Sequence, residues 1–329
     1  MSKNESVERL RSFLESRGSV ALKKARESIL NESFACKKVR DALRYFMVEY
    51  WHNYTTPTLL FLSHEAVGGK PERLVNLASA LILIDGAIDI HDDVVDRSRR
   101  KDGRWTVYGK FGKEVTLLVG DALFMKGFMK LVKACQTFEV EKTRKILDFL
   151  KKGFFELGEA EVLELEFRRR FDVKPERYLE VMYKKAANVE ALMYVGAFLG
   201  SAKAKEMEIL GRYGRIVGLI SILRDDLIDM TLQEELIHRI DYECLPLPLI
   251  YALNNSEIKS DLIKLLHKKK KTKEDLEKIF DFAQKGQGIA KTKRYIRKKA
   301  MEGEKLVNSL KGKNELNLIL RGLTDFENI

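Results

Sequence analysis

An apolar run that ends in a cluster of carboxylates determines the fold: Leu81-Ile82-Leu83-Ile84-Asp85-Gly86-Ala87-Ile88-Asp89-Ile90-His91-Asp92-Asp93-Val94-Val95-Asp96. A helix turns by about 100° per residue, so Asp92 and Asp96 share one face and Asp93 flanks them. A similar cluster, Asp225-Asp226-Leu227-Ile228-Asp229, ends the apolar run from Ile216 to Leu223. Two carboxylate clusters on two helices predict a place that holds a divalent metal.

Magnesium suits these clusters best, because it prefers hard oxygen ligands and commonly binds through one or two carboxylates together with substrate phosphates and water. The expected ligand is therefore a di- or triphosphate that Mg²⁺ bridges to two helices. The alternative is that each cluster is an ordinary acidic helix end that faces water. The occurrence of two such clusters, each closing an apolar helix, favours the metal site.

The rest of the chain predicts an all-α fold with a single domain. Apolar residues recur at spacings of three and four, and only five prolines occur in 329 residues. No segment alternates as a strand, and no linker rich in Pro, Gly or Ser interrupts the pattern. The expected helices cover residues 7–27, 36–50, 58–66, 72–96, 114–135, 139–171, 175–200 and 205–230, and the pattern continues to about residue 323.

Composition limits the possible location and partners. The first residues are polar and no run of 18 apolar residues occurs, so we expect a cytoplasmic protein without a transmembrane segment. Cys36, Cys135 and Cys244 are far apart and predict neither disulfides nor a zinc site. The net charge of +11 arises from lysines and arginines that lie among glutamates without interleaved aromatic residues, so we expect no nucleic-acid partner.

Several motifs now point to a known family. Besides the two aspartate clusters, the chain has Gly120-Asp121, then Tyr183-Lys184-Lys185-Ala186 with Gly196 twelve residues after Lys184, and then Leu245-Pro246-Leu247-Pro248-Leu249 after the second cluster. Over about residues 35 to 323 the chain resembles the trans-isoprenyl diphosphate synthases, the family of farnesyl, geranylgeranyl and polyprenyl diphosphate synthases. The resemblance implies a bundle of long helices around a central cavity. It divides the chain into an N-terminal helical segment, 1–34, and an isoprenoid synthase-like domain, 35–329.

The resemblance also implies a reaction. In the family, two or three Mg²⁺ ions join an allylic prenyl diphosphate to both aspartate motifs, and the C–O bond of the substrate ionises as diphosphate leaves. The implied metal ligands are Asp92, Asp93, Asp96, Asp225 and Asp229, with Asp226 in the same catalytic group. Lys184 is the implied diphosphate contact, while Lys101 and Arg239 fall where the family has an arginine and a lysine. The half-site for the allylic substrate therefore looks complete.

The half-site for the second substrate, isopentenyl diphosphate, looks altered. The family binds it with a lysine, two arginines and a His or Gln. In an ungapped alignment through Pro57 and Asp92, these four positions hold Asn53, Thr56, Asp102 and Asp85. Three cations are absent and two carboxylates are present, which disfavours a second diphosphate. A shift of the alignment in the loop would place Arg99 or Arg100 at one vacant position, but it would not supply the missing lysine.

The helix before Asp92 carries further unusual residues. Asp85 and Asp89 share a face with Asp92, in a wall that is apolar in the family because it surrounds the prenyl tail. Asp85, together with Asp102, would stabilise a cation or position water or an amine; alternatively, Asp85 or Asp89 forms a salt bridge to a neighbouring helix. Ala87 and Ile88 replace bulky aromatic residues of short-chain family members, so the tail pocket would accept about C15 to C20 or more.

Three functions remain open. The first is an ordinary chain-elongating prenyltransferase. The second is an enzyme that ionises only the allylic substrate, such as a class I terpene synthase-like lyase or a prenyltransferase to a non-diphosphate acceptor. The third is a non-catalytic subunit paired with an active homologue. We expect a homodimer or a heterodimer with a homologue. The prediction that covers the first two is a Mg²⁺-dependent, prenyltransferase-like enzyme of isoprenoid biosynthesis.

Overall fold

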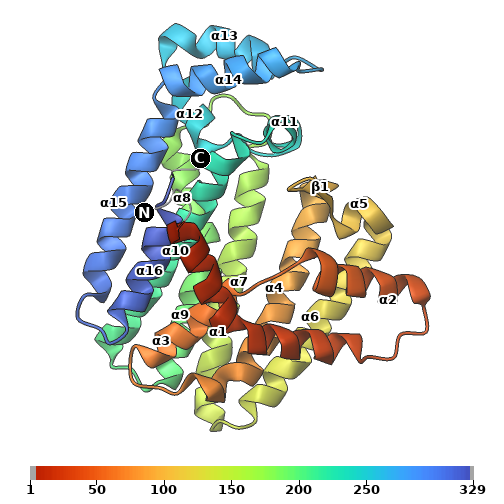
Figure 1. Ribbon diagram of the computed structural model, residues 1–329, viewed down its shortest axis with the longest axis vertical. Coiled ribbons are helices and arrows are strands. Elements are labelled where there is room, and N and C mark those ends of the chain that lie inside the picture. The colour runs from red at the N-terminus through yellow and green to blue at the C-terminus, as the bar shows by residue number, and fades with distance from the viewer. Residues whose placement is uncertain (1–4, 327–329) are drawn as a thin grey trace. The chain divides into compact units, whose positions relative to one another are not determined.

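The chain folds almost entirely into helices, as the sequence predicts. The computed structural model describes residues 5–326, and its ribbon is drawn in Figure 1. Within this part, the strands are limited to a hairpin of β1 (Arg100–Lys101) and β2 (Arg104–Trp105). The predicted all-α class is therefore confirmed, with this short hairpin as the addition.

Contacts between residues divide the chain into two compact units. The first unit consists of the described residues before Arg11, of Leu150–Ala191 and of the residues from Glu208 onward. The second unit consists of Arg11–Phe149 and Leu192–Met207. Each unit is described by itself below. Because the units interleave along the chain, they do not test the predicted division between residues 34 and 35, which stays a prediction.

The second unit contains the first aspartate cluster. Its elements are α1 (Glu5–Leu30, which begins in the first unit), α2 (Lys37–Arg44), the π-helix η1 (Tyr45–Tyr50), α3 (Thr55–Glu65), the 3₁₀-helix η2 (Pro71–Leu74), α4 (Val75–Val95), β1, β2, α5 (Val107–Phe111), α6 (Lys113–Cys135) and the first part of α7 (Val140–Leu165). The end of α9 (Ala187–Leu199) and the start of α10 (Ala204–Asp229) complete it.

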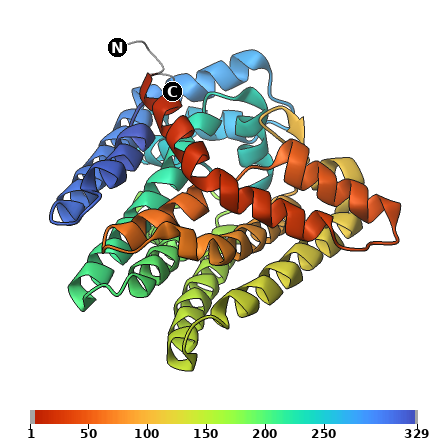
Figure 2. The same cartoon turned by 60° about the horizontal axis from the view of Figure 1, so that its bottom comes forward.

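The first unit contains the second aspartate cluster. It takes the rest of α7, α9 and α10, and adds α8 (Pro175–Lys185), α11 (Gln233–Tyr242), α12 (Leu247–Leu253), α13 (Ser256–Leu266), α14 (Lys273–Lys285), α15 (Gly288–Val307) and α16 (Lys313–Leu323). Helices α15 and α16 lie side by side in Figures 1 and 2.

The helix that carries the first cluster is the central helix of its unit. Helix α4 follows the turn that Pro71 begins, and Leu77, Ile82 and Leu83 are almost completely buried along it. It lies alongside α6 in Figures 1 and 2. Apolar burial of this extent is the main stabilising contribution to a helix in a globular protein. The aspartates at its end are therefore held on a rigid element.

The same helix is long and apolar enough to be examined as a membrane span. Within the described residues, Pro71–Val95 is the one stretch that meets this criterion, by length and composition only. Of its apolar window, 61% is buried inside the protein, which is typical of a core helix. The stretch is therefore only weak support for a membrane segment.

Candidate active site

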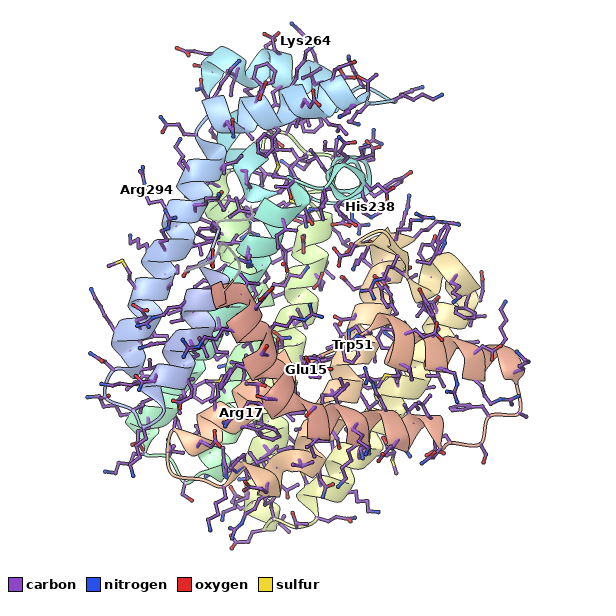
Figure 3. The ribbon with its side chains drawn as sticks, viewed as in Figure 1. Glu15, Arg17, Trp51, His238, Lys264 and Arg294 are labelled. Carbon is purple, nitrogen blue, oxygen red and sulfur yellow. The ribbon has the colours of Figure 1, made fainter. Side chains whose placement is uncertain are left out.

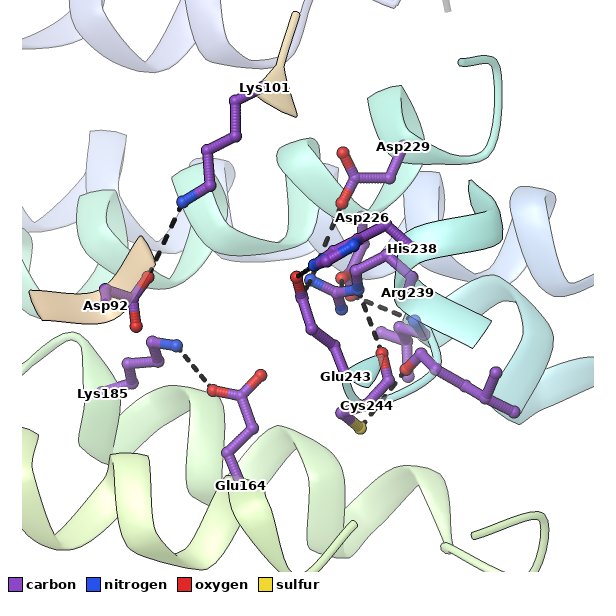
Figure 4. A network of polar contacts seen from close by, with 12 residues as sticks. Asp92, Lys101, Glu164, Lys185, Asp226, Asp229, His238, Arg239, Glu243 and Cys244 are labelled. Atoms are coloured by element: carbon purple, nitrogen blue, oxygen red, sulfur yellow. Dashed lines mark hydrogen bonds and ion pairs between the residues drawn. The ribbon is translucent and has the colours of Figure 1, made fainter. Parts of the chain in front are cut away.

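The first aspartate cluster lies where α4 ends. Asp92 and Asp93 belong to the last turn, and Asp96 is the residue that caps the helix. Lys101 on β1 reaches back to them: its Nζ lies 2.9 Å from Oδ1 of Asp93. It also lies 3.9 Å from Oδ2 of Asp92, a contact drawn in Figure 4. Burial raises the pKa of Asp93 to about 6, although the nearby charge of Lys101 acts in the opposite direction.

The hairpin explains why Lys101 reaches the cluster. Asp102 and Gly103 form its turn with φ values of 52° and 70°, and Lys101 pairs with Arg104 across it. An Asp-Gly pair with positive φ at both positions is the usual chemistry of a two-residue hairpin turn. The sequence analysis missed this hairpin, although the Asp-Gly pair was a usable signal. Asp102 therefore has a local structural reason for its residue type, besides its predicted place in the acceptor site.

The second aspartate cluster ends α10 in the first unit. Asp226 is 1% exposed and accepts hydrogen bonds from the Tyr178 hydroxyl at 2.7 Å, the Leu247 amide at 3.0 Å and Nη2 of Arg239 at 2.8 Å. Nη1 of Arg239 also lies 3.6 Å from Asp229 (Figure 4). Asp226 is thus fixed by protein donors, whereas Asp225 has none of these contacts.

Burial changes the acidity of this cluster. The pKa of Asp226 is raised to about 6 by burial, against the charge of Arg239. The carboxylate of Asp225 stays open to water but is crowded by protein, and this crowding together with the charges of Asp229 and Asp226 raises its pKa to about 7. The raised pKa values of Asp225 and Asp226 show that their charged forms are disfavoured in this structure, so added positive charge at the cluster would stabilise them.

The predicted diphosphate contact Lys184 lies at the end of α8. Its Nζ forms an ion pair at 2.8 Å with Glu159, and no described contact joins it to the second aspartate cluster. The neighbouring Lys185 pairs with Glu164 at 2.5 Å, and both influence the thiol of Cys244, which also lies close to Arg239 and Asp226 (Figure 4). Lys185 is therefore a candidate for a diphosphate contact beside Lys184, although the sequence analysis gave a role only to Lys184. Its signal was its position next to Lys184, one helical step away.

Three of the four altered acceptor positions come together in the second unit. The Thr56 hydroxyl and Nδ2 of Asn53, the latter at 3.2 Å, both donate to Oδ2 of Asp85. The indole of Trp51 (labelled in Figure 3) donates a hydrogen bond to Oδ2 of Asp89 at 2.6 Å. The described residues contain no ion pair to Asp85, so its partners are neutral donors rather than a salt bridge from another helix.

The two residues predicted to shape the tail pocket lie in the middle of α4. Ala87 is completely buried, and Ile88 is half-buried. Only Ile88 therefore has surface that a bound group could contact, and the role of both in setting tail length stays a prediction.

The donor set of both clusters suits magnesium. Within residues 5–326, no group of three or more His, Cys, Asp and Glu side chains converges into a metal cage of its own. Magnesium does not require such a cage, because it keeps several waters and shares one or two carboxylates with substrate phosphates. Carboxylates at the ends of rigid helices are the expected protein part of such a site.

The model of the polyprenyl synthetase family matches residues 46–283. The chain belongs to this family. The match confirms the resemblance that the motifs suggested, and it includes both aspartate clusters and the hairpin of Lys101.

Relatives of known identity agree with this membership. The chain is 34% identical over 180 residues to a short chain isoprenyl diphosphate synthase from Methanothermobacter thermautotrophicus, covering 54% of each chain. It is 33% identical over 205 residues to a geranylgeranyl diphosphate synthase from Methanosarcina mazei, covering 62% of each. The aligned regions therefore span little more than half the length of these relatives.

Solved structures share the fold. A geranylgeranyl pyrophosphate synthetase from Pyrococcus horikoshii Ot3 superposes with a TM-score of 0.85 at 23% identity, over 96% of this chain and 98% of the other. A polyprenyl synthase from Caulobacter crescentus CB15, solved in complex with calcium and isoprenyl diphosphate, has a TM-score of 0.78 at 22% identity, over 98% and 97%. At these identities the likeness shows the fold alone.

Proposed function

We propose that this protein is a Mg²⁺-dependent enzyme that binds and ionises an allylic prenyl diphosphate and transfers the prenyl group in isoprenoid biosynthesis. One observation carries the proposal: each of two apolar helices ends in an aspartate cluster, and a basic side chain contacts each cluster, Lys101 the first and Arg239 the second. Membership of the polyprenyl synthetase family supports it.

The aspartates of the two clusters have two different expected roles. Two or three Mg²⁺ ions would bind to Asp92, Asp93 and Asp96 on one helix and to Asp225 and Asp229 on the other. Asp226 would fix Arg239, because its oxygens are already occupied by protein donors. The metal, when bound, supplies the positive charge that stabilises departing diphosphate.

Basic side chains would add to this stabilisation. Lys101, Lys184 and Arg239 are the predicted diphosphate contacts, and Lys185 joins them as a candidate. Preorganised cations act where charge develops on the leaving group, and their effect is strongest where water is excluded. The ion pairs that hold these side chains keep them oriented before substrate arrives.

The altered acceptor half-site separates this protein from an ordinary chain-elongating enzyme. Asn53, Thr56 and Asp85 form one hydrogen-bonded cluster that contains a carboxylate and no cation. This cluster supports loss of the usual isopentenyl diphosphate site. It favours transfer to a non-diphosphate acceptor, or a terpene synthase-like reaction, over elongation.

The proposal includes a dimer. Helix α6 exposes an apolar face formed by Leu118 (64% exposed), Met125 (60%), Phe128 (44%) and Met129 (58%). Exposed apolar faces of this kind mark interaction sites. A second copy of the chain or a homologue would cover this face. Cytoplasmic location and the lack of a nucleic-acid partner stay predictions from composition.

The experiment is pyrophosphate release from geranylgeranyl diphosphate with Mg²⁺, with and without isopentenyl diphosphate. We expect release by the wild type and a loss of about 100-fold or more in Asp92→Ala and in Asp225→Ala. Asp261→Ala, which removes an exposed carboxylate paired only with Lys264, is the matched control. Circular dichroism checks folding, and unchanged release in a folded Asp92→Ala or Asp225→Ala variant would reject the metal assignment.

A further inference from the structure

Asp85 presents one free carboxylate oxygen beside the first aspartate cluster. It lies on α4, seven residues before Asp92. Oδ2 accepts the hydrogen bonds from Thr56 and Asn53, whereas Oδ1 has no hydrogen-bond partner among residues 5–326. The side chain is only partly buried, so a small group can reach Oδ1.

The neighbouring residues hold this carboxylate in one orientation. Oδ1 of Asn53 accepts a hydrogen bond from the Thr56 amide at 3.0 Å, and Nδ2 of Asn53 lies 3.0 Å from Oγ1 of Thr56. The donors on Oδ2 are therefore themselves fixed by the turn that begins α3. Residues held by such secondary hydrogen bonds keep the geometry that binding or catalysis requires.

The next carboxylate along the helix is occupied differently. Asp89 is bound by the indole of Trp51, a residue that is 9% exposed and whose ring stacks on Phe46 with centroids 5.0 Å apart. Asp89 thus completes a structural contact between α4 and the segment before α3. It provides a comparison residue with the same chemistry on the same helix.

Charge limits the kind of molecule that can approach Oδ1. The described residues form no ion pair with Asp85, and the charge of Asp89 lies nearby. Two carboxylates repel an anionic acceptor such as a second diphosphate. A cationic acceptor would bind, but it would place like charges together when a carbocation forms beside it. The remaining class is a neutral molecule that donates a hydrogen bond.

We propose that Oδ1 of Asp85 binds the hydroxyl group of a neutral acceptor and removes its proton as the acceptor oxygen is prenylated. This inference rests on the proposed function. The C–O bond between the allylic carbon and diphosphate breaks, and its electron pair leaves with diphosphate. A lone pair of the acceptor oxygen forms the new C–O bond, and the hydroxyl proton passes to Asp85. The products are diphosphate and a prenyl ether, or a prenyl alcohol when the acceptor is water.

The acidity of Asp85 is suited to this role. Burial raises its pKa to about 7, opposed by the hydrogen bond from Thr56 and assisted by the charge of Asp89. A base with a pKa near the working pH is the most effective in general base catalysis. Charged groups of neighbouring elements act on residues next to Asp85: the charge of Lys101 lowers the pKa of Asp89, and Arg26 of α1 donates to the Trp51 carbonyl at 3.4 Å.

The test uses the full chain with geranylgeranyl diphosphate, Mg²⁺ and glycerol in [¹⁸O]water, in parallel reactions with and without isopentenyl diphosphate. Mass spectrometry separates a geranylgeranyl glyceryl ether from ¹⁸O-labelled geranylgeraniol, and so distinguishes an organic hydroxyl acceptor from water. We expect one of these products in amounts equal to the pyrophosphate released. Asp85→Asn keeps the size of the side chain but cannot take a proton, and we expect a loss of transfer of about 100-fold.

Two further readouts separate a proton acceptor from a structural residue. The ratio of wild-type transfer to Asp85→Asn transfer should rise with pH through about 7, because only the wild type gains a base when Asp85 ionises. The ratio cancels the ionisation of Asp225, whose pKa is also about 7 and which both proteins share. Asp89→Asn, the matched control, should keep the wild-type product ratio and a rise of transfer with pH, and the rise should move to lower pH because the charge that helps to raise the pKa of Asp85 is gone. Thr56→Val, which removes one anchor of Oδ2, should reduce transfer and gives a second variant if Asp85→Asn does not fold.

Three outcomes overturn the inference. Elongated product that depends on isopentenyl diphosphate, with neither ether nor labelled alcohol, rejects a hydroxyl acceptor and the loss of the isopentenyl diphosphate site, but it leaves the Mg²⁺-dependent ionisation of an allylic diphosphate intact. Equal transfer by wild type, Asp85→Asn and Thr56→Val rejects the role of Asp85. The absence of pyrophosphate release under every condition rejects both the inference and the proposed function.

Discussion

Arg239 is the residue on which the second aspartate cluster depends. It contacts Asp226 and Asp229, donates to the Cys244 carbonyl at 3.0 Å and lies 3.5 Å from Glu243. Burial alone would lower its pKa, but the carboxylates outweigh that effect and raise it. The resemblance placed a cation at this position. The structure adds that this cation neutralises a carboxylate that is itself almost fully buried.

Replacing Arg239 should therefore be costly. We expect Arg239→Met to lower the free energy of unfolding by about 3 to 5 kcal/mol at pH 8, because Asp226 would remain buried and charged without its partner. The loss should be smaller at pH 5, where Asp226, with a pKa of about 6, binds a proton instead. Urea denaturation at the two pH values measures both.

The control for this prediction is another arginine in the same unit. Arg212 forms an ion pair with Glu302, but its side chain is 54% exposed. Arg212→Met should change the free energy of unfolding by about 0.5 kcal/mol or less. Equal losses for the two variants would contradict the role assigned to burial.

Asp85 offers a test of acidity through stability. Its pKa is about 7 in the folded protein and near 3.8 in the unfolded chain. Below the lower value both states are protonated and no penalty exists. As the pH rises from about 4 to 7 the unfolded chain ionises first, so the folded state loses stability, and above 7 the penalty is complete.

Asp85→Asn removes this penalty. We expect it to raise the free energy of unfolding by about 1 to 2 kcal/mol at pH 8, after allowance for partial exposure, and to change it little at pH 4. Thermal unfolding at both pH values measures the difference. A variant that is less stable than the wild type at pH 8 would show that the hydrogen bonds to Asp85 require its charge.

At the scale of elements, the close packing of α4 and α6 places the first cluster. A Cβ atom at Gly127 of α6 would lie 2.8 Å from Cγ1 of Ile84 and 3.0 Å from its backbone nitrogen. Glycine at this position therefore allows the two helices to approach closely. The apolar pattern predicted both helices, but it contained no indication of which turns would touch.

This contact leads to a prediction about Gly127. We expect Gly127→Ala to destabilise the protein by about 1 to 3 kcal/mol, because the added methyl group would push the helices apart. Gly158, an exposed glycine of α7 where an added Cβ atom would meet no described atom within 4 Å, is the matched control. Gly158→Ala should stabilise by about 0.5 to 1 kcal/mol. Chemical denaturation measures the change in the free energy of unfolding of each variant. Changes of the same sign in the two variants would contradict the packing argument.

At the scale of the whole molecule, each compact unit contains one aspartate cluster, and the second unit also exposes the apolar face of α6. Leu118, Met125 and Met129 are more than half exposed, so association with another chain would remove apolar surface from water. Oligomeric state therefore belongs to this scale, because no single residue or helix determines it.

The apolar face of α6 predicts the effect of a charge placed on it. We expect the wild type to sediment as a dimer and Met125→Glu to raise the dissociation constant by about tenfold or more, since a carboxylate would be desolvated in the interface. Met301→Glu, at a methionine of α15 that is 58% exposed, is the matched control and should leave the dimer intact. A monomeric wild type in analytical ultracentrifugation would contradict the proposed interface.

Local information was sufficient for part of this protein. The helical periodicity, the two aspartate clusters at helix ends and the family membership all follow from residues that are close together in the sequence. So does the turn at Asp102-Gly103, which the sequence analysis could have predicted from the pair alone. Periodicity and turn chemistry are properties of neighbouring residues, and a single chain displays them directly.

Only the tertiary structure decided which distant side chains meet. Thr56 and Asn53 bind Asp85 across 29 and 32 residues, and Tyr178 binds Asp226 across 48. From the sequence, Asp85 could equally have contacted a ligand or formed a salt bridge, and the ion pairs of Lys184 with Glu159 and of Lys185 with Glu164 could not be foreseen. Such contacts depend on how whole helices pack and turn about their axes, and this is set by many apolar contacts summed over the core rather than by the local pattern around any one residue.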